Sequence, residues 1–313
     1  MSSIKDEIPE INESIKSTLS YFGLFKYPLL PKEIHRFLNY QCDYKVFLAA
    51  LTEMKNRNEV FLSGDGFYSL EENPLWSVER LVGNNRAEKL LYQSLKYVKK
   101  ISSCPFVVSI AISGSLSKYY AAQEADIDYF IITKKNRLWI ARTLLHFYKK
   151  FTFIGGNEHY YCMNYFIDES ALEIDQKNIY SAIETVTLIP SYNNELISEL
   201  KMKNTWVKEF LPNESYTEDL RFLLPKKKCW VKQFFEAFIN LIGAVGINSF
   251  LMDATDRKWR RKWRKTGYPM ENYDQAFYTT LNISKNHPAN YQSQILTALE
   301  SNTQLTEQPS CNL

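Results

Sequence analysis

Two aspartates, Asp126 and Asp128, stand one residue apart in the segment DIDYFIIT, which has the apolar character of a buried strand. Side chains on a strand alternate between its two faces, so both carboxylates are expected on the same side. Burying two neighbouring carboxylates without compensation costs several kcal/mol. A divalent cation removes that cost, and hard oxygen ligands at this spacing suit Mg²⁺, which also binds substrate phosphates. The alternative is a solvated strand end that carries ordinary surface acids.

A Gly-Ser pair, Gly114 and Ser115, precedes the aspartates and follows the apolar run FVVSIAIS. Gly114 lets the backbone approach a ligand closely because it has no side chain. Ser115 is expected to begin a helix over 115–123, where free N–H groups and the helix dipole attract a phosphate. Lys118 in that helix is a candidate phosphate ligand, with a solvated lysine as the alternative. Together with the acid pair, these are the parts that phosphoryl or nucleotidyl transfer needs.

The segment ISGSLSKYYAAQEADIDYFII resembles the signature of the polymerase β-type nucleotidyltransferase superfamily. That signature is an apolar strand, Gly-Ser, a spacer, and then acid-apolar-acid, and the resemblance covers residues 104–175. It implies that Asp126 and Asp128 hold two Mg²⁺ ions, which bind a nucleoside triphosphate. It also implies that an acceptor hydroxyl, whose carrier the sequence does not identify, attacks the α-phosphate while pyrophosphate leaves.

Members of the superfamily normally take a third carboxylate from a later strand. The matching segment here is YYCMNYFID, 160–168, in which the neutral Asn164 occupies that position. Asp168 at the end of the segment is a second candidate, and Glu173 and Asp175 follow it. The missing acid leaves two hypotheses open. One is an active nucleotidyltransferase, and the other is a catalytically silent module that binds a nucleotide for regulation.

The first 75 residues predict three helices followed by a hairpin around Gly64-Asp65-Gly66. This order resembles a winged helix-turn-helix domain, whose third helix usually enters the DNA major groove. Here the third helix, 44–57, carries Lys45, Lys55 and Arg57 among acidic neighbours. A surface that reads phosphates should be clearly basic, so the sequence favours a packing or protein-contact module over DNA binding.

The sequence therefore predicts an α+β protein. We expect a winged-helix-like domain at 1–75, a connecting helix at 76–103 and a mixed-sheet nucleotidyltransferase core at 104–190. A helical C-terminal region at 191–300 and a frayed tail at 301–313 complete the chain. Within the core, strands are expected near 106–113, 126–133 and 160–168, with a short fourth strand at 171–174.

The composition limits which partners and which cellular location we expect for the protein. The net charge of +3 is too small to imply nucleic-acid binding by the chain as a whole. The five scattered cysteines suggest reduced thiols, and the four histidines show no zinc-like spacing. The N-terminal segment lacks the pattern of a secretory signal, so a cytoplasmic location is expected.

Two segments near the C-terminus have unusual composition. Residues 234–252 form an apolar run, and Glu236, Asn240 and Asn248 within it favour a buried or amphipathic helix over a membrane span. Residues 257–265 contain seven basic side chains, interrupted by two tryptophans that would dock together on the core of a helical protein. The basic run is a solvated helix face, a nucleic-acid or triphosphate contact, or, with the apolar run, a contact to an anionic membrane.

Overall fold

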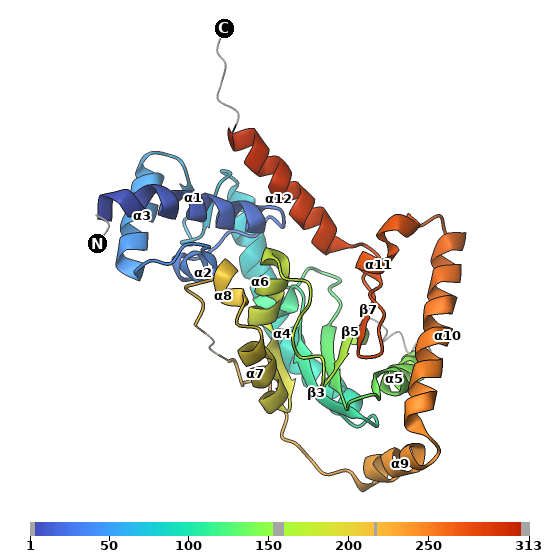
Figure 1. Cartoon of the computed structure of the whole chain (residues 1–313). Coiled ribbons are helices and arrows are strands. Elements are labelled where there is room, and N and C mark those ends of the chain that lie inside the picture. Colours follow the sequence, from blue (N-terminus) through green and yellow to red (C-terminus); the bar gives the residue numbers. More distant parts are fainter. Residues whose placement is uncertain (1–3, 153–159, 216–217, 308–313) are drawn as a thin grey trace.

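A mixed five-stranded sheet lies at the centre of the protein, as Figure 1 shows. The structure is a computed structural model that describes residues 4–152, 160–215 and 218–307. The strand order is β6-β3-β4-β5-β7, in which only the pair β4–β5 is parallel. The strands are β3 (Val107–Ile112), β4 (Asp128–Thr133), β5 (Cys162–Asp168), β6 (Ile189–Tyr192) and β7 (Ile283–Lys285). The expected α+β class is confirmed.

Both faces of the sheet are buried, because the central strands are apolar at successive positions. Ile112 pairs with Tyr129 and Ile110 with Ile131 across β3 and β4. Tyr129 and Ile131 pack beneath α4 (Pro74–Ser102) and α5 (Leu138–Thr152). Phe130 and Ile132 face the opposite layer, which includes α7 (Asn194–Lys203). This alternation follows the period-two geometry of a strand.

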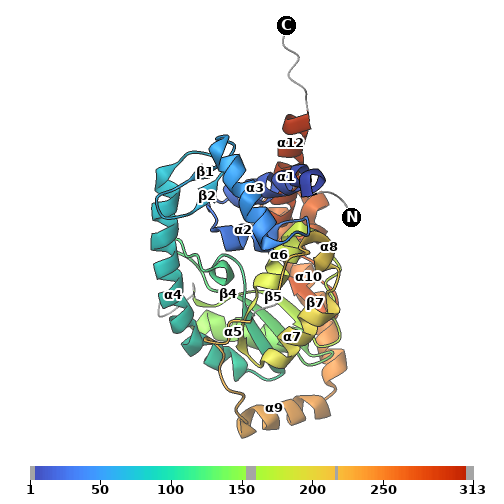
Figure 2. The same cartoon turned by 90° about the vertical axis from the view of Figure 1, so that its left-hand side faces the viewer.

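The N-terminal segment forms three helices and a short hairpin. These elements are α1 (Ile4–Gly23), α2 (Pro31–Phe37), α3 (Tyr44–Asn56), β1 (Phe61–Leu62) and β2 (Tyr68–Ser69). Their apolar side chains share one hydrophobic cluster with α6 (Ile179–Thr187), α8 (Val207–Phe210) and α12 (Tyr291–Glu307). Figure 2 shows α4 running along one side of the molecule, from this segment to the sheet. The N-terminal segment is thus packed onto later parts of the chain.

The apolar run at 234–252 is not one helix. It is divided between α9 (Trp230–Leu241) and α10 (Ala244–Lys265), which meet at an angle of 88°. Gly243 occupies the break with a φ of 92°, a left-handed conformation that favours glycine. Among the residues that the structure describes, no single helix is long and apolar enough to cross a bilayer; the bent pair passes that test by length and composition only.

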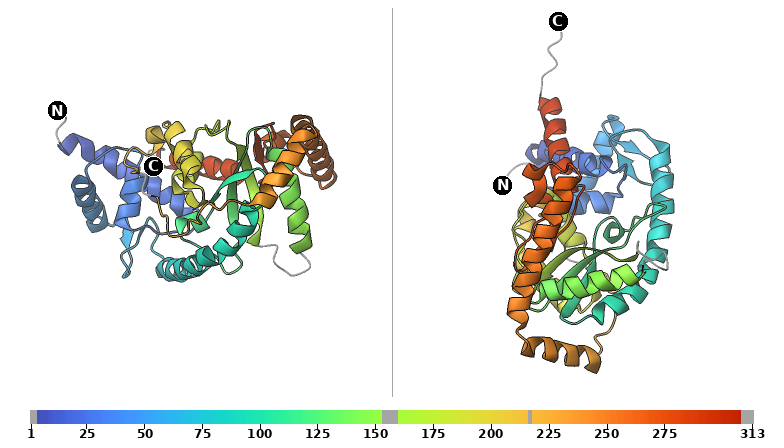
Figure 3. Two further views of the ribbon diagram at one scale, coloured as in Figure 1. Left: turned by 90° about the horizontal axis from the view of Figure 1, so that it is seen from below. Right: turned by 90° about the vertical axis from the view of Figure 1, so that its right-hand side faces the viewer.

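The tryptophans of the basic run dock on the core, as expected. Trp259 is buried against Trp139 and Phe277, and Trp263 packs on Phe277. Phe277 directly follows α11 (Tyr273–Ala276), which itself follows the short turn η4 (Met270–Asn272). Figure 3 shows α10, in orange, beside α5, in green. Most of the basic side chains of 257–265 are exposed on α10.

Three expectations about local structure were wrong. The helix expected at 115–123 is only a 3₁₀ turn, η1 (Leu116–Lys118), which ends because Tyr119 adopts a left-handed φ of 58°. The strand expected at 171–174 is irregular, since the side chain of Asn204 bonds both Leu172 O and Ile174 N in place of a strand neighbour. Further strands instead come from β6 and β7, in regions expected to be helical.

Candidate functional site

Gly114 forms the turn where β3 leaves the sheet, directly beside Asp128. Its φ is +68°, and a Cβ atom on this residue would lie 2.6 Å from Asp128 Oδ2. The backbone is held there by the hydrogen bond from Ser113 N to Asp128 O, 3.0 Å long. Both the conformation and the space therefore require glycine at this position. The sequence-based expectation that the Gly-Ser turn lies against the acid pair is thus met for Asp128.

Asp126 and Asp128 do not share a strand. β4 begins at Asp128, and Asp126 belongs to the irregular segment before it. The reason is that β3 ends at Ile112, which pairs with Tyr129, so β3 offers no further partner to residues before Asp128. Both aspartates nevertheless line one cavity. The charge of Asp126 also acts on Asp128, but the argument that both side chains project from one strand is wrong.

Asp128 is half-buried, and the negative charges of neighbouring carboxylates act on it. Burial is the main cause that raises the pKa of this carboxyl to about 6, and the charges of Asp126 and Glu184 raise it further. The side chain of Cys162 and the ammonium of Lys118 oppose the shift. The protein itself thus offsets only part of the free-energy cost of the negative charge on ionised Asp128. A cation bound between these carboxylates would supply the missing compensation.

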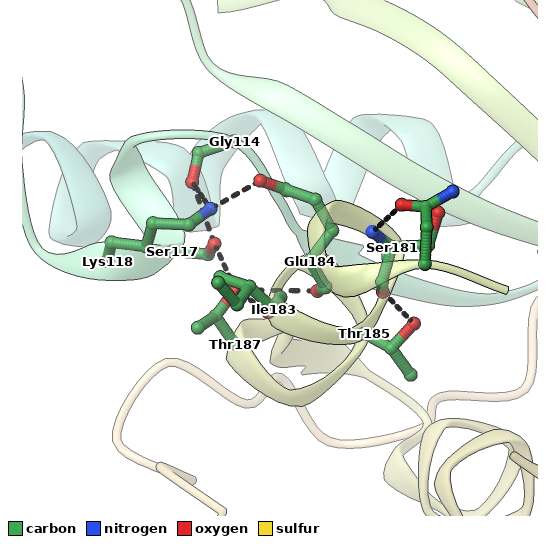
Figure 4. Close-up of polar contacts among 9 residues, drawn as sticks. Gly114, Ser117, Lys118, Ser181, Ile183, Glu184, Thr185 and Thr187 are labelled. Carbon is green, nitrogen blue, oxygen red and sulfur yellow. Dashed lines mark hydrogen bonds and ion pairs between the residues drawn. The ribbon is translucent and has the colours of Figure 1, made fainter. Parts of the chain in front are cut away.

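Lys118 and Glu184 tie the turn η1 to helix α6, as Figure 4 shows. Lys118 Nζ donates to Glu184 Oε1 at 2.6 Å and to Gly114 O at 3.0 Å. Ser117 Oγ donates to Gly114 O at 2.8 Å, which fixes the same carbonyl from a second side. Lys118 therefore supports the turn and is already paired. Because η1 is a single short turn, Ser115 does not begin the helix that the phosphate argument assumed.

Glu184 was not identified from the sequence. It is the only charged residue of α6, in the segment IYSAIETVT, whose other faces are largely buried. A lone acid on an apolar helix is the signal that would have singled it out. It joins Asp126 and Asp128 in lining the cavity.

Asn164 and Asp168, the two candidates for the position of the third carboxylate, lie at different places on β5. Asn164 lines the cavity, and its Nδ2 donates to Cys162 Sγ at 2.9 Å. Asp168 is fully buried at the far end of β5. Its carboxylate accepts hydrogen bonds from Asn136 N, Ser170 N and Ser170 Oγ at 2.6–2.9 Å. Asp168 therefore stabilises the loops beyond the strand and does not contribute to the cavity, and the exposed Glu173 pairs with Lys177 instead.

The cavity has a volume of about 610 Å³ and is lined by segments far apart in the sequence. The lining includes the Gly-Ser turn, Asp126 and Asp128, and aromatic rings from the N-terminal segment, the segment after η1, β5, α6 and α12. These rings belong to Tyr21, Phe22, Phe25, Tyr27, Tyr120, Tyr165, Tyr180 and Tyr291. The N-terminal helices thus form part of the site.

Lys285 and His287 add basic groups to the same cavity. Lys285 is buried, and its ammonium donates to Gln176 Oε1 at 3.0 Å and Gln292 Oε1 at 2.7 Å. Burial lowers the pKa of Lys285 to about 8 and that of His287 to about 4. No sequence pattern pointed to these residues, since β7 is short and lies in a polar segment.

The donor set suits magnesium held jointly with a phosphate ligand. Across the described ranges 4–152, 160–215 and 218–307, no three His, Cys, Asp or Glu side chains are grouped as a metal site. Mg²⁺, however, is commonly bound by one or two carboxylates together with substrate phosphates and water. Asp126 and Asp128 supply two hard oxygen ligands. The pKa of Asp128 is raised mainly by burial and further by the charges of Asp126 and Glu184, and a bound cation would offset both effects.

Comparisons of the chain with protein-family models, with curated proteins and with solved structures found no match.

Proposed function

We propose that the protein is a magnesium-dependent nucleotidyltransferase that moves a nucleoside monophosphate from a triphosphate to an acceptor hydroxyl. The observation that carries this proposal is the contact between Gly114 and Asp128, in a cavity that Asp126 also lines. A glycine that leaves the backbone bare next to the Asp128 carboxylate suits a triphosphate bound with its cation. The polymerase β-like arrangement of the core belongs to the same proposal.

The side chains of the cavity have distinct roles in this proposal. Asp126 and Asp128 hold the metal, whose bound charge would stabilise the phosphates during displacement. Glu184 on helix α6 adds negative charge to the cavity and pairs with Lys118, but among the described residues it is not grouped with the two aspartates as a metal site. Lys285 places an ammonium where a triphosphate oxygen can accept from it. The tyrosine rings offer flat apolar surface to a nucleobase.

Titration calorimetry with a non-hydrolysable ATP analogue and Mg²⁺ tests the binding step. We expect the double variant Asp126→Asn, Asp128→Asn to bind at least about tenfold more weakly, because both metal ligands are lost. Glu173→Gln is the matched control, since Glu173 is an exposed acid whose described partner is Lys177. Equal affinity of the double variant and the wild type would contradict the proposal.

A second function, nucleotide binding without transfer, is favoured by the neutral residue at the position of the third carboxylate. Asn164 is neutral and is engaged with Cys162 Sγ, and Glu184 is already paired with Lys118. Under this alternative the cavity binds a nucleotide without transferring it. Incubation with labelled triphosphates and a cell extract separates the two functions, because only the transferase produces magnesium-dependent labelling that Asp128→Asn abolishes.

We also propose that the winged-helix-like N-terminal segment serves packing rather than DNA contact. Directly after α3, Arg57 is paired with Glu53 and lies 3.9 Å from Glu59, so its charge is partly neutralised. Tyr21 and Tyr27 from this segment line the cavity. Tyr27 Oη also donates to Lys118 O at 2.7 Å. These contacts suit a wall of the substrate site better than a nucleic-acid surface.

A further inference from the structure

Helix α9 presents a row of large apolar side chains to solvent. Trp230, Phe234, Phe238 and Leu241 are 77%, 64%, 52% and 85% exposed. Their spacing places them on one face of the helix. Further exposed apolar side chains extend this face on both sides and across the bend: Val231, Phe235, Ile242 and Val245. Figures 1 and 2 show α9 at the lower edge of the molecule.

The opposite face of α9 is polar, and this face holds the helix on the protein. Lys232 Nζ donates to Ser102 O at 2.8 Å and to Val107 O at 2.6 Å. One turn later, Glu236 is buried; its Oε1 accepts from Phe106 N at 2.7 Å. Its Oε2 pairs with Lys134 at 2.5 Å.

This arrangement inverts the usual one. A surface helix normally buries its apolar stripe against the core and leaves its polar face in water. In α9 the apolar Ile239 is packed against the core, whereas the aromatic row points away from it. Packing against the described residues therefore does not account for the aromatic row, and an exposed apolar patch of this kind marks a docking surface.

We propose that α9 lies in the surface of an anionic lipid bilayer, with the row from Trp230 to Leu241 inserted among the lipids. Lys226, Lys227 and Lys228 are exposed and lie just before the helix, with Cys229 between; Lys226 lies 3.9 Å from Glu195. The only acid within α9 is Glu236, which faces the protein. An apolar face bordered by cations, with tryptophan at its end, has the chemistry of an interfacial helix on anionic lipid.

The charges distinguish a bilayer from a second copy of the chain. Two copies would bring together two identical apolar faces with two identical positive borders, so the lysines would add no attraction. Anionic headgroups attract the same lysines. The bend of 88° after α9 also lets this helix lie flat while α10 leads away from the surface.

The proposed membrane contact is separate from the cavity. α9 is bonded to Phe106 and Val107 at the start of β3, whereas Gly114 follows the other end of that strand. The strand spans about 20 Å, given its six residues at about 3.3 Å each. The basic run 257–265 also lies at the far end of α10 and is not part of the contact. Membrane binding through α9 would thus leave the Gly114 turn of the cavity at the other end of β3 from the lipid contact.

Co-sedimentation of the full chain with lipid vesicles tests the proposal. We expect binding to phosphatidylcholine vesicles that contain phosphatidylglycerol, and weaker binding to pure phosphatidylcholine. Phe234→Ser with Phe238→Ser should lower binding at least about tenfold, because two inserted rings are lost. The matched control, Leu75→Ser with Met202→Ser, changes side chains that are 67% and 68% exposed elsewhere and should bind as the wild type does.

A charge variant tests the contribution of the lysines separately from that of the apolar side chains of α9. Lys226→Glu, Lys227→Glu and Lys228→Glu together leave every apolar side chain in place, and should abolish the preference for anionic vesicles. The proposal is overturned if the wild type stays in solution with anionic vesicles, or if the serine variant binds as well as the wild type. A second result would also overturn it: the wild type does not bind vesicles, light scattering shows that it is a dimer, and the serine variant is a monomer.

Discussion

Three ionisable side chains of the cavity, Asp128, Lys285 and His287, share one physical condition, the loss of water. Burial raises the pKa of Asp128 to about 6 and lowers that of Lys285 to about 8. Each shift disfavours the charged form. A carboxylate and an ammonium that both resist ionisation in one cavity are not neutralising each other. The cavity therefore suits a ligand that brings both signs, such as a phosphate group with its cation.

Lys285 gives a pH-dependent prediction at the scale of one residue. Its pKa falls from a usual 10.5 to about 8 because of burial, so the folded protein is destabilised while this side chain carries its charge. That penalty is full below about pH 8, and it disappears towards pH 10.5 as the unfolded chain also loses the proton. Lys285→Met should therefore raise the free energy of unfolding at pH 7 by about 1–3 kcal/mol.

Urea denaturation between pH 7 and the alkaline range measures this gain, which should shrink as the pH rises through about 8. The same variant should bind a triphosphate more weakly, since the ammonium is lost. Lys203→Met, which removes an exposed lysine, is the control. A variant that is less stable than the wild type at pH 7 would show that the bonds to Gln176 and Gln292 outweigh the cost of burial.

Gly114 gives a second prediction at this scale. An added methyl group would combine a strained left-handed backbone with a contact of 2.6 Å to Asp128 Oδ2. Gly114→Ala should lower the free energy of unfolding by about 1–3 kcal/mol and weaken triphosphate binding. Thermal denaturation and calorimetry measure the two effects. Gly23→Ala, where an added Cβ meets nothing within 4 Å, should change neither, and equal behaviour of both variants would refute the role of the turn.

At the scale of elements, the sequence predicts those that carry a long pattern of their own. The apolar runs of β3 and β4, the helical period of α5 and the hairpin turn at Gly64–Gly66 are all local signals. The edge strands β6 and β7 have four and three residues. Segments that short show no usable period, and they become strands only because β3 and β5 offer them hydrogen bonds.

The site was predictable where its residues are close in sequence, and not where the fold assembles them. Gly114, Asp126 and Asp128 were found because they belong to one segment. Glu184 and Lys285 come from α6 and β7, and nothing local shows that these elements end at the same cavity. The course of the chain at Asp126 was also mispredicted, because the end of β3 depends on the turn at Gly114 and not on the residues of β4.

At the scale of the whole molecule, the N-terminal segment and the later chain form one packed body. The cluster that contains Phe22, Phe37 and Leu51 also contains Ile183 and Trp206. Helix α12, near the end of the described chain, packs against both α1 and α6. The cavity lies at this junction, with walls from both parts. Loss of the junction should therefore disturb the site as well as the fold.

Breaking the ion pair Arg36–Glu214 tests whether the N-terminal segment and the later chain unfold together. Glu214 is buried at 1% exposure, and Arg36 on α2 donates to its carboxylate from Nε and, at 2.9 Å, from Nη2. Glu214→Ala should lower the free energy of unfolding by about 1–3 kcal/mol, because Arg36 loses its partner at a largely buried contact. If the two parts are one cooperative unit, tryptophan fluorescence and far-ultraviolet circular dichroism will report one coincident transition, shifted as a whole.

The exposed pair Lys203–Glu199 provides the control, and Glu199→Ala should change stability by less than about 0.5 kcal/mol. The decisive measurement is the shape of the Glu214→Ala transition. Two separate steps, of which only the first is shifted, would mean that the N-terminal segment folds independently. The cavity wall that it provides would then be able to detach while the sheet with Asp126 and Asp128 remains folded. A single shifted step means that any ligand bound at the junction would stabilise the whole chain.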